Sequence, residues 1–413
     1  MTRQVRRRRV LQGIGGATAL GLAGCLGGDK NGGGGGGTNR TIKQGVLQPL
    51  SGDLGDLGKP IKDAAILPFT TTETDFTLDK KVADTQTNPN AGQTAATSLV
   101  DAGYPAVTGA ASSEVTIQVA KEVFIPNGVV GCSPASTSPA ITDLKDNNLI
   151  WRTPPTDALQ GKVLAQIAKE REDATTAATL YVNNSYGQLL SKSFSSAFKN
   201  TGGSIQTQVS FQKEQSSYSS PLSQALGGDP DVLVVIGYPA SGKQLFRDFY
   251  SDTDGSTPIL ITDGLKSASL PSDVGNAMSN VKGTAPLAAG PGKDFFTSKF
   301  KSEYGSEPGV FTSQAFDATA VCLLANAAAG KNVGAKIAEK MQAVANPGGE
   351  TITPKTLGDG LKKAANGTEI QYKGASSAVD FDSNGDLKAA TYELFGFKKG
   401  GGIKSIDEIK FSA

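Results

Sequence analysis

The chain has 413 residues, with 40 basic and 39 acidic side chains and no histidine. This balanced charge offers no basic field to a nucleic acid, so we expect no nucleic-acid partner. The absence of histidine excludes Ser-His-Asp and Cys-His catalytic sites and histidine metal ligands. We expect a protein that is not an enzyme and holds no metal or other cofactor; an enzyme such as an amidase that relies on lysine or carboxylate chemistry is the alternative.

Residues 1–25 have the pattern of an export signal. Five arginines and no acid accompany the apolar stretch LQGIGGATALGLAG, which is shorter than the about 20 apolar residues of a membrane span. Arg7 and Arg8 resemble a twin-arginine export motif, and Leu22–Cys25 resembles the lipobox of prokaryotic lipoproteins, in which Cys25 is lipidated. An uncleaved anchor is the alternative. In both cases we expect the remaining chain outside the cytoplasmic membrane, held to its outer face.

Residues 26–40 are rich in glycine and have few side chains to bury, so they are expected to form a flexible linker. Without residues 1–25, the chain retains 35 of its 40 basic residues and all 39 acidic ones, which is a mildly acidic balance. The about 370 residues that follow the linker suggest two domains.

From residue 41 onward, short apolar strands alternate with amphipathic helices, and this alternation predicts parallel α/β sheets with helices on both faces. The expected strands are 42–50, 76–85, 105–110, 128–132, 176–184, 204–211, 231–238 and 258–264. The expected helices are 61–69, 91–103, 116–124, 159–172, 186–202, 241–254, 293–305, 313–330 and 356–367. Residues 378–411 are expected to form strands joined by turns.

Three segments interrupt this alternation and predict places where the chain crosses between two lobes. They are NLIWRTPPTDALQG, VKGTAPLAAGPGK and TEIQYKGASSAVDF. Three crossings divide the chain into lobe 1, residues 41–153 plus 284–372, and lobe 2, residues 154–283 plus 373–413. We expect a cleft between these two discontinuous lobes.

Eight further segments follow one another along the chain: GVLQPLSGDLGDLGKP, VTGAASSEVT, VGCSPASTSPAITD, LIWRTPPTDALQGK, LYVNNSYGQLLSKSF, DVLVVIGYPASGKQLFRDFY, LITDGLK and AVDFDSNGDLKAATYELF. In this order they resemble the periplasmic leucine/isoleucine/valine-binding proteins, the solute receptors of ABC importers. The resemblance implies an α/β, two-lobed type I periplasmic-binding fold, in which each lobe has a mostly parallel sheet. It also implies a monomer that binds a branched-chain or related amino acid in the cleft and delivers it to a membrane permease.

An amino-acid ligand needs donors for its carboxylate and acceptors for its ammonium. Ser112 and Ser113 stand where a strand ends and a helix begins, so their hydroxyls and amides suit a carboxylate; simple capping of the helix is the alternative. By the resemblance, the Ala135 carbonyl accepts from the ammonium and Thr137 contacts the ligand, with Ser136 between them. These residues could equally form only a turn.

From the other lobe, Tyr186 and Tyr238 follow strand ends and are expected to close over the ligand. Asp263 also follows a strand and suits an ammonium partner, although it could instead cap the next turn. By the resemblance, Leu57 occupies the place where many amino-acid receptors have an aromatic ring. This departure leaves open a receptor for amides, urea or aromatic acids, and a sensor for a membrane signalling protein is a further alternative.

Two motifs imitate other sites. Residues 237–244 read G-x-x-x-x-G-K like a phosphate-binding loop, but Gln244 replaces the Ser or Thr that holds Mg²⁺. The segment DFDSNGD imitates a calcium loop, but Thr391 stands where a bidentate Glu is needed, and a β-turn explains the same residues. Whether Cys132 and Cys322 pair is left open, with buried free thiols favoured.

Overall fold

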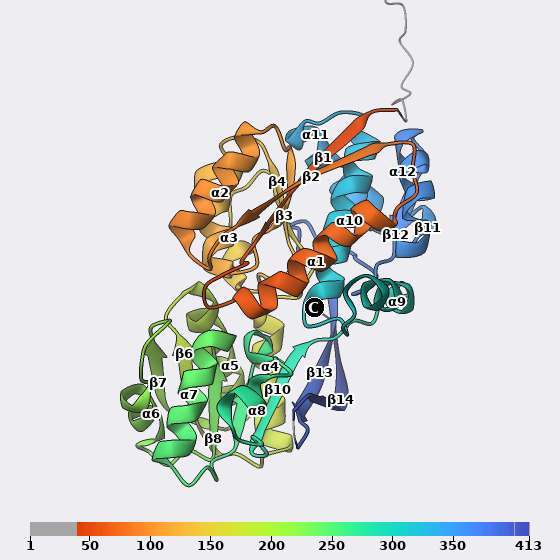
Figure 1. Ribbon diagram of the computed structural model, residues 1–413. Coiled ribbons are helices and arrows are strands. Elements are labelled where there is room, and N and C mark those ends of the chain that lie inside the picture. The colour runs from red at the N-terminus through yellow and green to blue at the C-terminus, as the bar shows by residue number, and fades with distance from the viewer. Residues whose placement is uncertain (1–38, 400, 413) are drawn as a thin grey trace, which may run out of the picture. The chain divides into compact units, whose positions relative to one another are not determined.

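The computed structural model describes residues 39–399 and 401–412 (Figure 1). The expected signal segment, the lipobox with Cys25 and all but the end of the linker lie outside the described residues. Two sheets organise the rest. The prediction of an α/β fold with two mainly parallel sheets is confirmed.

The first sheet has five strands in the order β2-β1-β3-β4-β5, all of them parallel. The strands are β1 (Thr41–Gln48), β2 (Thr77–Asp84), β3 (Ala106–Gly109), β4 (Val130–Ser133) and β5 (Ile150–Arg152). The helices between them are α1 (Gly55–Thr71), α2 (Pro89–Asp101) and α3 (Ser113–Val119), which continues as the π-helical turn η1 (Ala120–Phe124), with η2 (Pro139–Ile141) before β5. Buried on both faces, β3 and β4 match the expectation for central parallel strands.

The second sheet has seven strands in the order β14-β13-β10-β9-β8-β6-β7. Its strands are β6 (Thr176–Val182), β7 (Ser204–Phe211), β8 (Val232–Ile236), β9 (Ile259–Ile261), β10 (Val281–Pro286), β13 (Ala389–Phe397) and β14 (Ile403–Ser412). Strands β6 to β10 pair in parallel, whereas β13 and β14 are antiparallel additions. The intervening helices are α4 (Asp157–Glu170), α5 (Ser185–Asn200), α6 (Ser219–Leu226), α7 (Pro239–Asp252), η3 (Asp263–Leu265) and α8 (Leu270–Val274).

Between β10 and β13 the chain returns to the first sheet. This stretch contains α9 (Lys293–Tyr304), α10 (Thr312–Ala329), α11 (Gly334–Ala345), η4 (Pro354–Thr356), α12 (Leu357–Ala365) and a two-stranded sheet of β11 (Glu350–Ile352) and β12 (Ile370–Tyr372). Helix α10 is buried over almost its whole length and packs against α1, α11 and α12 (Figure 1). Hereafter, the first lobe means the elements on the five-stranded sheet, and the second lobe those on the seven-stranded sheet.

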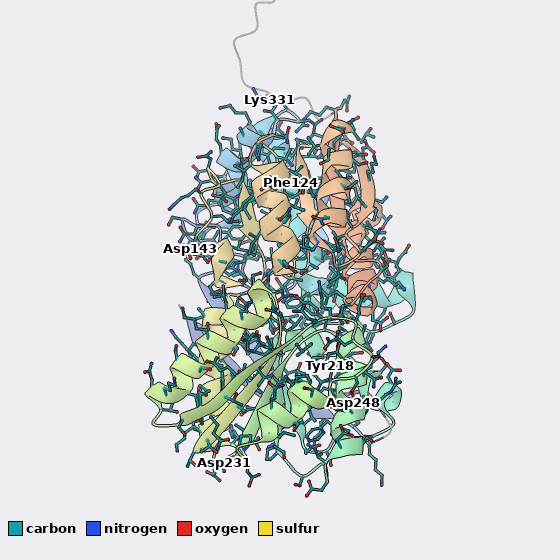
Figure 2. All side chains as sticks on the ribbon, turned by 90° about the vertical axis from the view of Figure 1, so that its left-hand side faces the viewer. Phe124, Asp143, Tyr218, Asp231, Asp248 and Lys331 are labelled. Atoms are coloured by element: carbon teal, nitrogen blue, oxygen red, sulfur yellow. The ribbon has the colours of Figure 1, made fainter. Side chains whose placement is uncertain are left out.

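The chain thus passes between the two sheets after β5, after β10 and after β12. The residue limits of the lobes remain predictions, and the expected limit between 283 and 284 falls within β10. Each lobe has its own aromatic packing. Phe124 belongs to an apolar cluster of the first lobe, and Figure 2 labels it there and Tyr218 in the second lobe. Tyr218 packs edge-on against Phe211, with ring centroids 5.2 Å apart.

A buried ion pair joins the first and third crossings. The guanidinium of Arg152, at the end of β5, is fully buried and donates to both carboxylate oxygens of Asp386 and to the carbonyl of Ser138. Both the charge and the remaining donors of Arg152 therefore have partners inside the protein, as a buried cation requires.

The segment that imitates a calcium loop is the turn that presents Asp386. Asp382 accepts from the backbone amides two and four residues later, at 2.7 and 3.0 Å, which is an Asx turn. Asp380 pairs with Lys388 at 2.8 Å. Within the part of the chain that the structure describes, no cluster of three or more His, Cys, Asp or Glu residues is arranged to hold a metal ion.

Cys132 in β4 and Cys322 in α10 are both buried and free. Burial, followed by the neighbouring Cys322 thiol, raises the pKa of Cys132 well above its ordinary value. Such a thiol is protonated and therefore unreactive at neutral pH. In the described part of the chain, none of the helices has both the length and the apolar character needed to cross a membrane.

Candidate functional site

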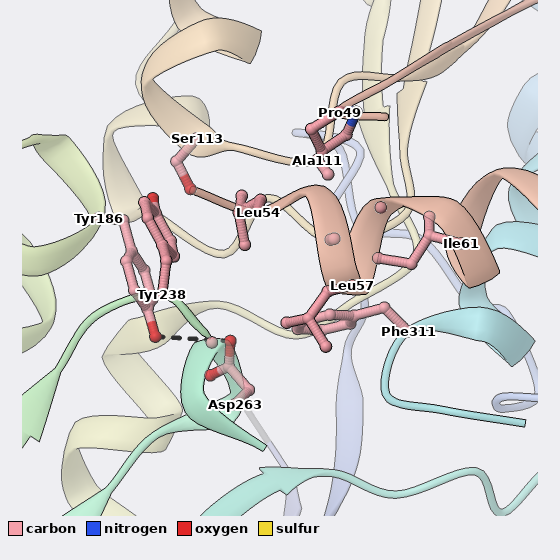
Figure 3. Close-up of a pocket in the computed structure, with 13 residues that line it drawn as sticks. Pro49, Leu54, Leu57, Ile61, Ala111, Ser113, Tyr186, Tyr238, Asp263 and Phe311 are labelled. Atoms are coloured by element: carbon pink, nitrogen blue, oxygen red, sulfur yellow. Dashed lines mark hydrogen bonds between the residues drawn. The ribbon is translucent and has the colours of Figure 1, made fainter. Parts of the chain in front are cut away.

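A cavity lies where loops of the two lobes meet (Figure 3). In both sheets, these loops follow the carboxyl ends of parallel strands, where α/β proteins bind ligands. The cavity is lined by Pro49, Leu54, Leu57, Gly58, Ile61, Ala111, Ser113, Ala135, Tyr186, Tyr238, Asp263, Gly264 and Phe311.

Asp263 supplies the charge at one end of the cavity. Its side chain is 2% exposed, and one oxygen, Oδ2, accepts a long hydrogen bond of 3.5 Å from the hydroxyl of Tyr186. The other oxygen, Oδ1, has no donor among the residues that the structure describes. Burial raises the pKa of Asp263 to about 6, so it is ionised at neutral pH without a countercharge.

A second acid, Asp157, is buried near Asp263. It stands in the first turn of α4, its amide donates to the carbonyl of Thr137 at 2.8 Å, and neither carboxylate oxygen has a donor in residues 39–399 and 401–412. Burial, and then the charge of Asp263, raise the pKa of Asp157 well above its ordinary value. The sequence analysis did not identify Asp157, because an acid in a first helical turn is ordinarily explained by the helix dipole.

The start of α3 supplies donors. Ser112 is the N-cap residue, but its side chain makes no capping hydrogen bond, and its buried hydroxyl has no partner in the described chain. The simple capping that the sequence left open for Ser112 is therefore not observed. Ser113 lines the cavity, and its hydroxyl accepts from the amide of Ser138 at 3.2 Å. The first amides of any helix lack intrahelical acceptors, so this end of α3 suits a carboxylate.

The residues of the loop after β4 differ in whether they reach the cavity. Ala135 lines the cavity, whereas the Ser136 hydroxyl is engaged with Thr116 at 2.7 Å and with two backbone carbonyls of the β3–α3 loop. Ser136 therefore holds two loops together. Thr137 is buried but is not a lining residue, and its hydroxyl has no partner within the described residues.

Two tyrosines form one wall of the cavity. The rings of Tyr186 and Tyr238 stack with centroids 5.6 Å apart and planes 10° from parallel (Figure 3). The Tyr186 hydroxyl is 2.7 Å from the hydroxyl of Thr262, and the Tyr238 hydroxyl accepts from Asn184 at 3.1 Å. The two rings are therefore held in place, and their hydroxyls already have hydrogen-bond partners within the protein.

The opposite wall is apolar. Leu54, Leu57 and Ile61 face the cavity from α1 and the loop before it, and Phe311 lies beside Leu57 (Figure 3). Phe311 adopts a left-handed backbone conformation with φ of 62° where the chain enters α10. Among the lining residues, all in the described chain, there is no lysine or arginine.

The structure thus brings most of the predicted residues to one cavity. The predicted lining residues are Leu57, Ser113, Ala135, Tyr186, Tyr238 and Asp263. Ser112, Ser136 and Thr137 are buried but are not among the lining residues. The sequence analysis missed Leu54, Ile61 and Phe311, because apolar residues at helical spacing are ordinarily core residues.

Comparison with known proteins places this chain among related receptors. A family model described as periplasmic binding protein matches residues 41–360. The chemotactic signal transduction system substrate-binding protein BasB of Halobacterium salinarum is 28% identical over 303 residues, covering 72% of this chain and 71% of BasB.

Two solved structures share the fold. A branched-chain amino acid transporter substrate-binding protein of Streptococcus pneumoniae, in complex with isoleucine, aligns with a TM-score of 0.74 and 19% identity, over 90% of this chain and 100% of the other. A solute-binding protein of R. palustris in complex with benzoate aligns with a TM-score of 0.69 and 16% identity, over 89% and 96% of the two chains.

Proposed function

The chain belongs to the periplasmic binding protein family, and from this premise we propose that it is a receptor for an α-amino acid with an apolar side chain. As a solute-binding protein of the ABC transporter type, it is a receptor and not an enzyme. The amino acid binds in the cavity between the two lobes.

The observation that carries this proposal is the buried carboxylate of Asp263, with no cation in the cavity lining. A ligand that binds beside it must bring a positive charge of its own, since a buried carboxylate is costly unless it is paired. The ammonium of an amino acid supplies that charge. An aromatic acid such as benzoate would instead add a negative charge beside Asp263.

The start of α3 and the apolar lining residues suit the carboxylate and the side chain of such a ligand. The free hydroxyl of Ser112 and the first amides of α3 suit the carboxylate. Leu54, Leu57, Ile61 and Phe311 offer only apolar contacts and so favour a hydrocarbon side chain over an amide or urea. Phe311 supplies an aromatic ring beside Leu57, where the sequence analysis found none.

Two partners are compatible with such a receptor. We propose delivery to an ABC permease, and the similarity to the substrate-binding protein of a branched-chain amino acid transporter supports this. The similarity to BasB supports a second candidate, a sensor that reports the ligand to a chemotactic membrane receptor. Permease genes beside this gene, and loss of uptake without loss of chemotaxis on its deletion, would distinguish transport from sensing.

Export and lipid attachment through Cys25 are part of the same proposal, because a receptor of this kind must be held near its membrane partner. The experiment is mass spectrometry of the chain isolated from membranes. We expect the N-terminal peptide to begin at Cys25 with an added lipid mass. A peptide that still contains residues 1–24 would contradict cleavage at the lipobox.

Matched ligands test the site itself. Leucine and 4-methylpentanoate differ only by the ammonium, so a thermal-shift assay should give a shift with leucine, isoleucine or valine and none with 4-methylpentanoate or benzoate. At 100 times the dissociation constant, binding adds about 2.7 kcal/mol to the free energy of unfolding. A shift with the acids that lack an ammonium, and none with amino acids, would overturn the proposal.

A further inference from the structure

The two lobes are joined at the rim of the cavity by a buried carboxylate. Asp53, in the loop between β1 and α1, accepts at Oδ1 from the backbone amide of Ser241 at 2.7 Å and from its hydroxyl at 2.8 Å. Its second oxygen, Oδ2, also lies 2.8 Å from that hydroxyl. Asp53 is 1% exposed and Ser241 is 2% exposed, so the contact excludes water.

Ser241 stands in the first turn of α7, and this helix has no N-cap side chain of its own. The N-cap position is Tyr238, which makes no capping bond, and Pro239 at the next position has no N–H to donate. The Ala240 amide contacts the backbone carbonyl of Asp53 at 3.4 Å. The first amides of α7 are thus satisfied by a residue of the other lobe, whose charge also suits the helix dipole.

This contact explains the stretch that resembles a phosphate-binding loop. Residues 237–244 do form an anion-binding helix start after a strand, but the anion is the carboxylate of Asp53. Lys243, which a phosphate site would aim at the phosphate, instead pairs at the surface with Asp56 at 2.8 Å and with Asp273 at 3.1 Å.

Neighbouring contacts hold the same junction. Lys213 donates to the carbonyl of Thr87 across the lobes at 3.0 Å, and the Glu214 amide donates to the Ser241 hydroxyl at 3.2 Å. The loop that carries Lys213 and Glu214 is fixed in turn by Tyr218, whose amide donates to Asp248 of α7 (Figure 2). The acceptor from one lobe therefore meets a preformed group of donors on the other.

We propose that Asp53 is the positioning residue that couples ligand binding to lobe closure, by capping α7 only when the lobes meet. This inference rests on the proposed function. Asp53 immediately precedes Leu54, and Tyr238 opens α7, so the cap joins the two cavity walls that enclose the ligand. Separation of the lobes would expose Asp53 and the α7 amides to water, so the cap stabilises the closed state alone.

The test compares Asp53→Ala and Ser241→Ala with Asp56→Asn, a matched control in the first turn of α1 that removes an exposed partner of Lys243. A hydrogen bond to a charged group contributes about 1.5–3 kcal/mol, which corresponds to roughly 10- to 150-fold. Stopped-flow kinetics should show leucine dissociating faster by roughly that factor from Asp53→Ala. We expect Asp56→Asn to stay within about twofold of the original chain.

The double variant Asp53→Ala/Ser241→Ala should release leucine no faster than Asp53→Ala alone, because Asp53→Ala already removes the acceptor of the Ser241 hydroxyl. Additive effects would contradict a shared contact. Unchanged dissociation rates in both single variants would overturn the proposal.

Amide hydrogen exchange of the peptide that contains Ser241 provides a second measurement. Saturating leucine should slow exchange at the start of α7 in the original chain and in Asp56→Asn but not in Asp53→Ala, and equal slowing in all three would overturn the cap. If no amino acid slows exchange or binds in any of them, the proposed function is refuted, an outcome distinct from loss of the slowing in Asp53→Ala alone. Thermal unfolding of both variants checks that they fold.

Discussion

Replacement of Asp263 by asparagine is expected to stabilise the unliganded protein while it weakens leucine binding. Burial raises the pKa of Asp263 from 3.8 to about 6 in the folded chain. A group whose folded pKa is raised stabilises the fold below its unfolded pKa, and this contribution is lost as the pH rises through the folded pKa. Above pH 6, the ionised carboxylate therefore costs the fold about 3 kcal/mol.

The amide introduced by Asp263→Asn would not titrate, so the gain in the free energy of unfolding should be about 3 kcal/mol at pH 7.5 and should vanish near pH 4. Urea unfolding followed by the fluorescence of Trp151, the single tryptophan, measures this difference. The same variant should bind leucine roughly 30-fold or more weakly, since removing one partner of a buried charge pair costs about 2–5 kcal/mol. A variant that is less stable at pH 7.5, or a gain independent of pH, would refute the reasoning.

Asp317 provides the matched comparison. Burial raises its pKa to about 6 as well, but its oxygens accept from the hydroxyl of Tyr372, the amides of Ala375 and Ser376, and the hydroxyl of Ser376. In Asp317→Asn, the new amide group would face these donors, so we expect a loss of stability at pH 7.5. The two substitutions should therefore act in opposite directions although the two pKa values are alike.

The remaining predictions concern the cavity and the core. Leucine affinity should fall about tenfold per pH unit below pH 6, because Asp263 must lose a proton to pair with the ammonium. Calorimetry across pH 4.5–8 measures the affinity, and an affinity that does not change with pH would contradict the prediction. Gly264→Ala would place a Cβ 2.4 Å from the carbonyl oxygen of Gly237, so leucine binding should weaken at least about tenfold. An unchanged affinity for leucine would show that the loop moves to accept the methyl group. Cys132 and Cys322 should react with a thiol reagent only after unfolding, and rapid labelling of the native chain would show that this core opens.

The sequence predicts those helices and strands whose pattern lies within the segment itself. The strand expected at 204–211 is β7, and the helix expected at 293–305 is α9, since the apolar spacing and closing glycine lie within the segment. Strand β10, VKGTAP, has few apolar residues, and its sequence predicts a crossing between the lobes instead of a strand. It is a strand because it pairs with β9 on one side and with β13 on the other, and the latter lies about a hundred residues later.

The residues of the candidate site likewise fall into those that the sequence could predict and those that it could not. Asp263, Tyr186 and Tyr238 could be identified because polar residues that follow buried strands gather at the edge of a parallel sheet. Leu54 and Ile61 could not, because their spacing with Leu57 is that of any helix facing a core. Phe311 reaches the cavity from a segment about 250 residues away in sequence, and no local pattern indicates this approach.

The two imitated motifs have a common explanation. The sequence predicts only a helix start at α7 and a β-turn at Asp382, whereas the structure shows that the first supplies donors for an anion and that the second presents the carboxylate of Asp386. The partners could not be inferred, because Asp53 lies 188 residues from Ser241 and Asp386 lies 234 residues from Arg152. Each partner joins segments that belong to different crossings or different lobes. The donors at the start of α7 thus join the two lobes, and the carboxylate of Asp386 joins two of the crossings between them. A receptor that closes on its ligand needs specific contacts at these places.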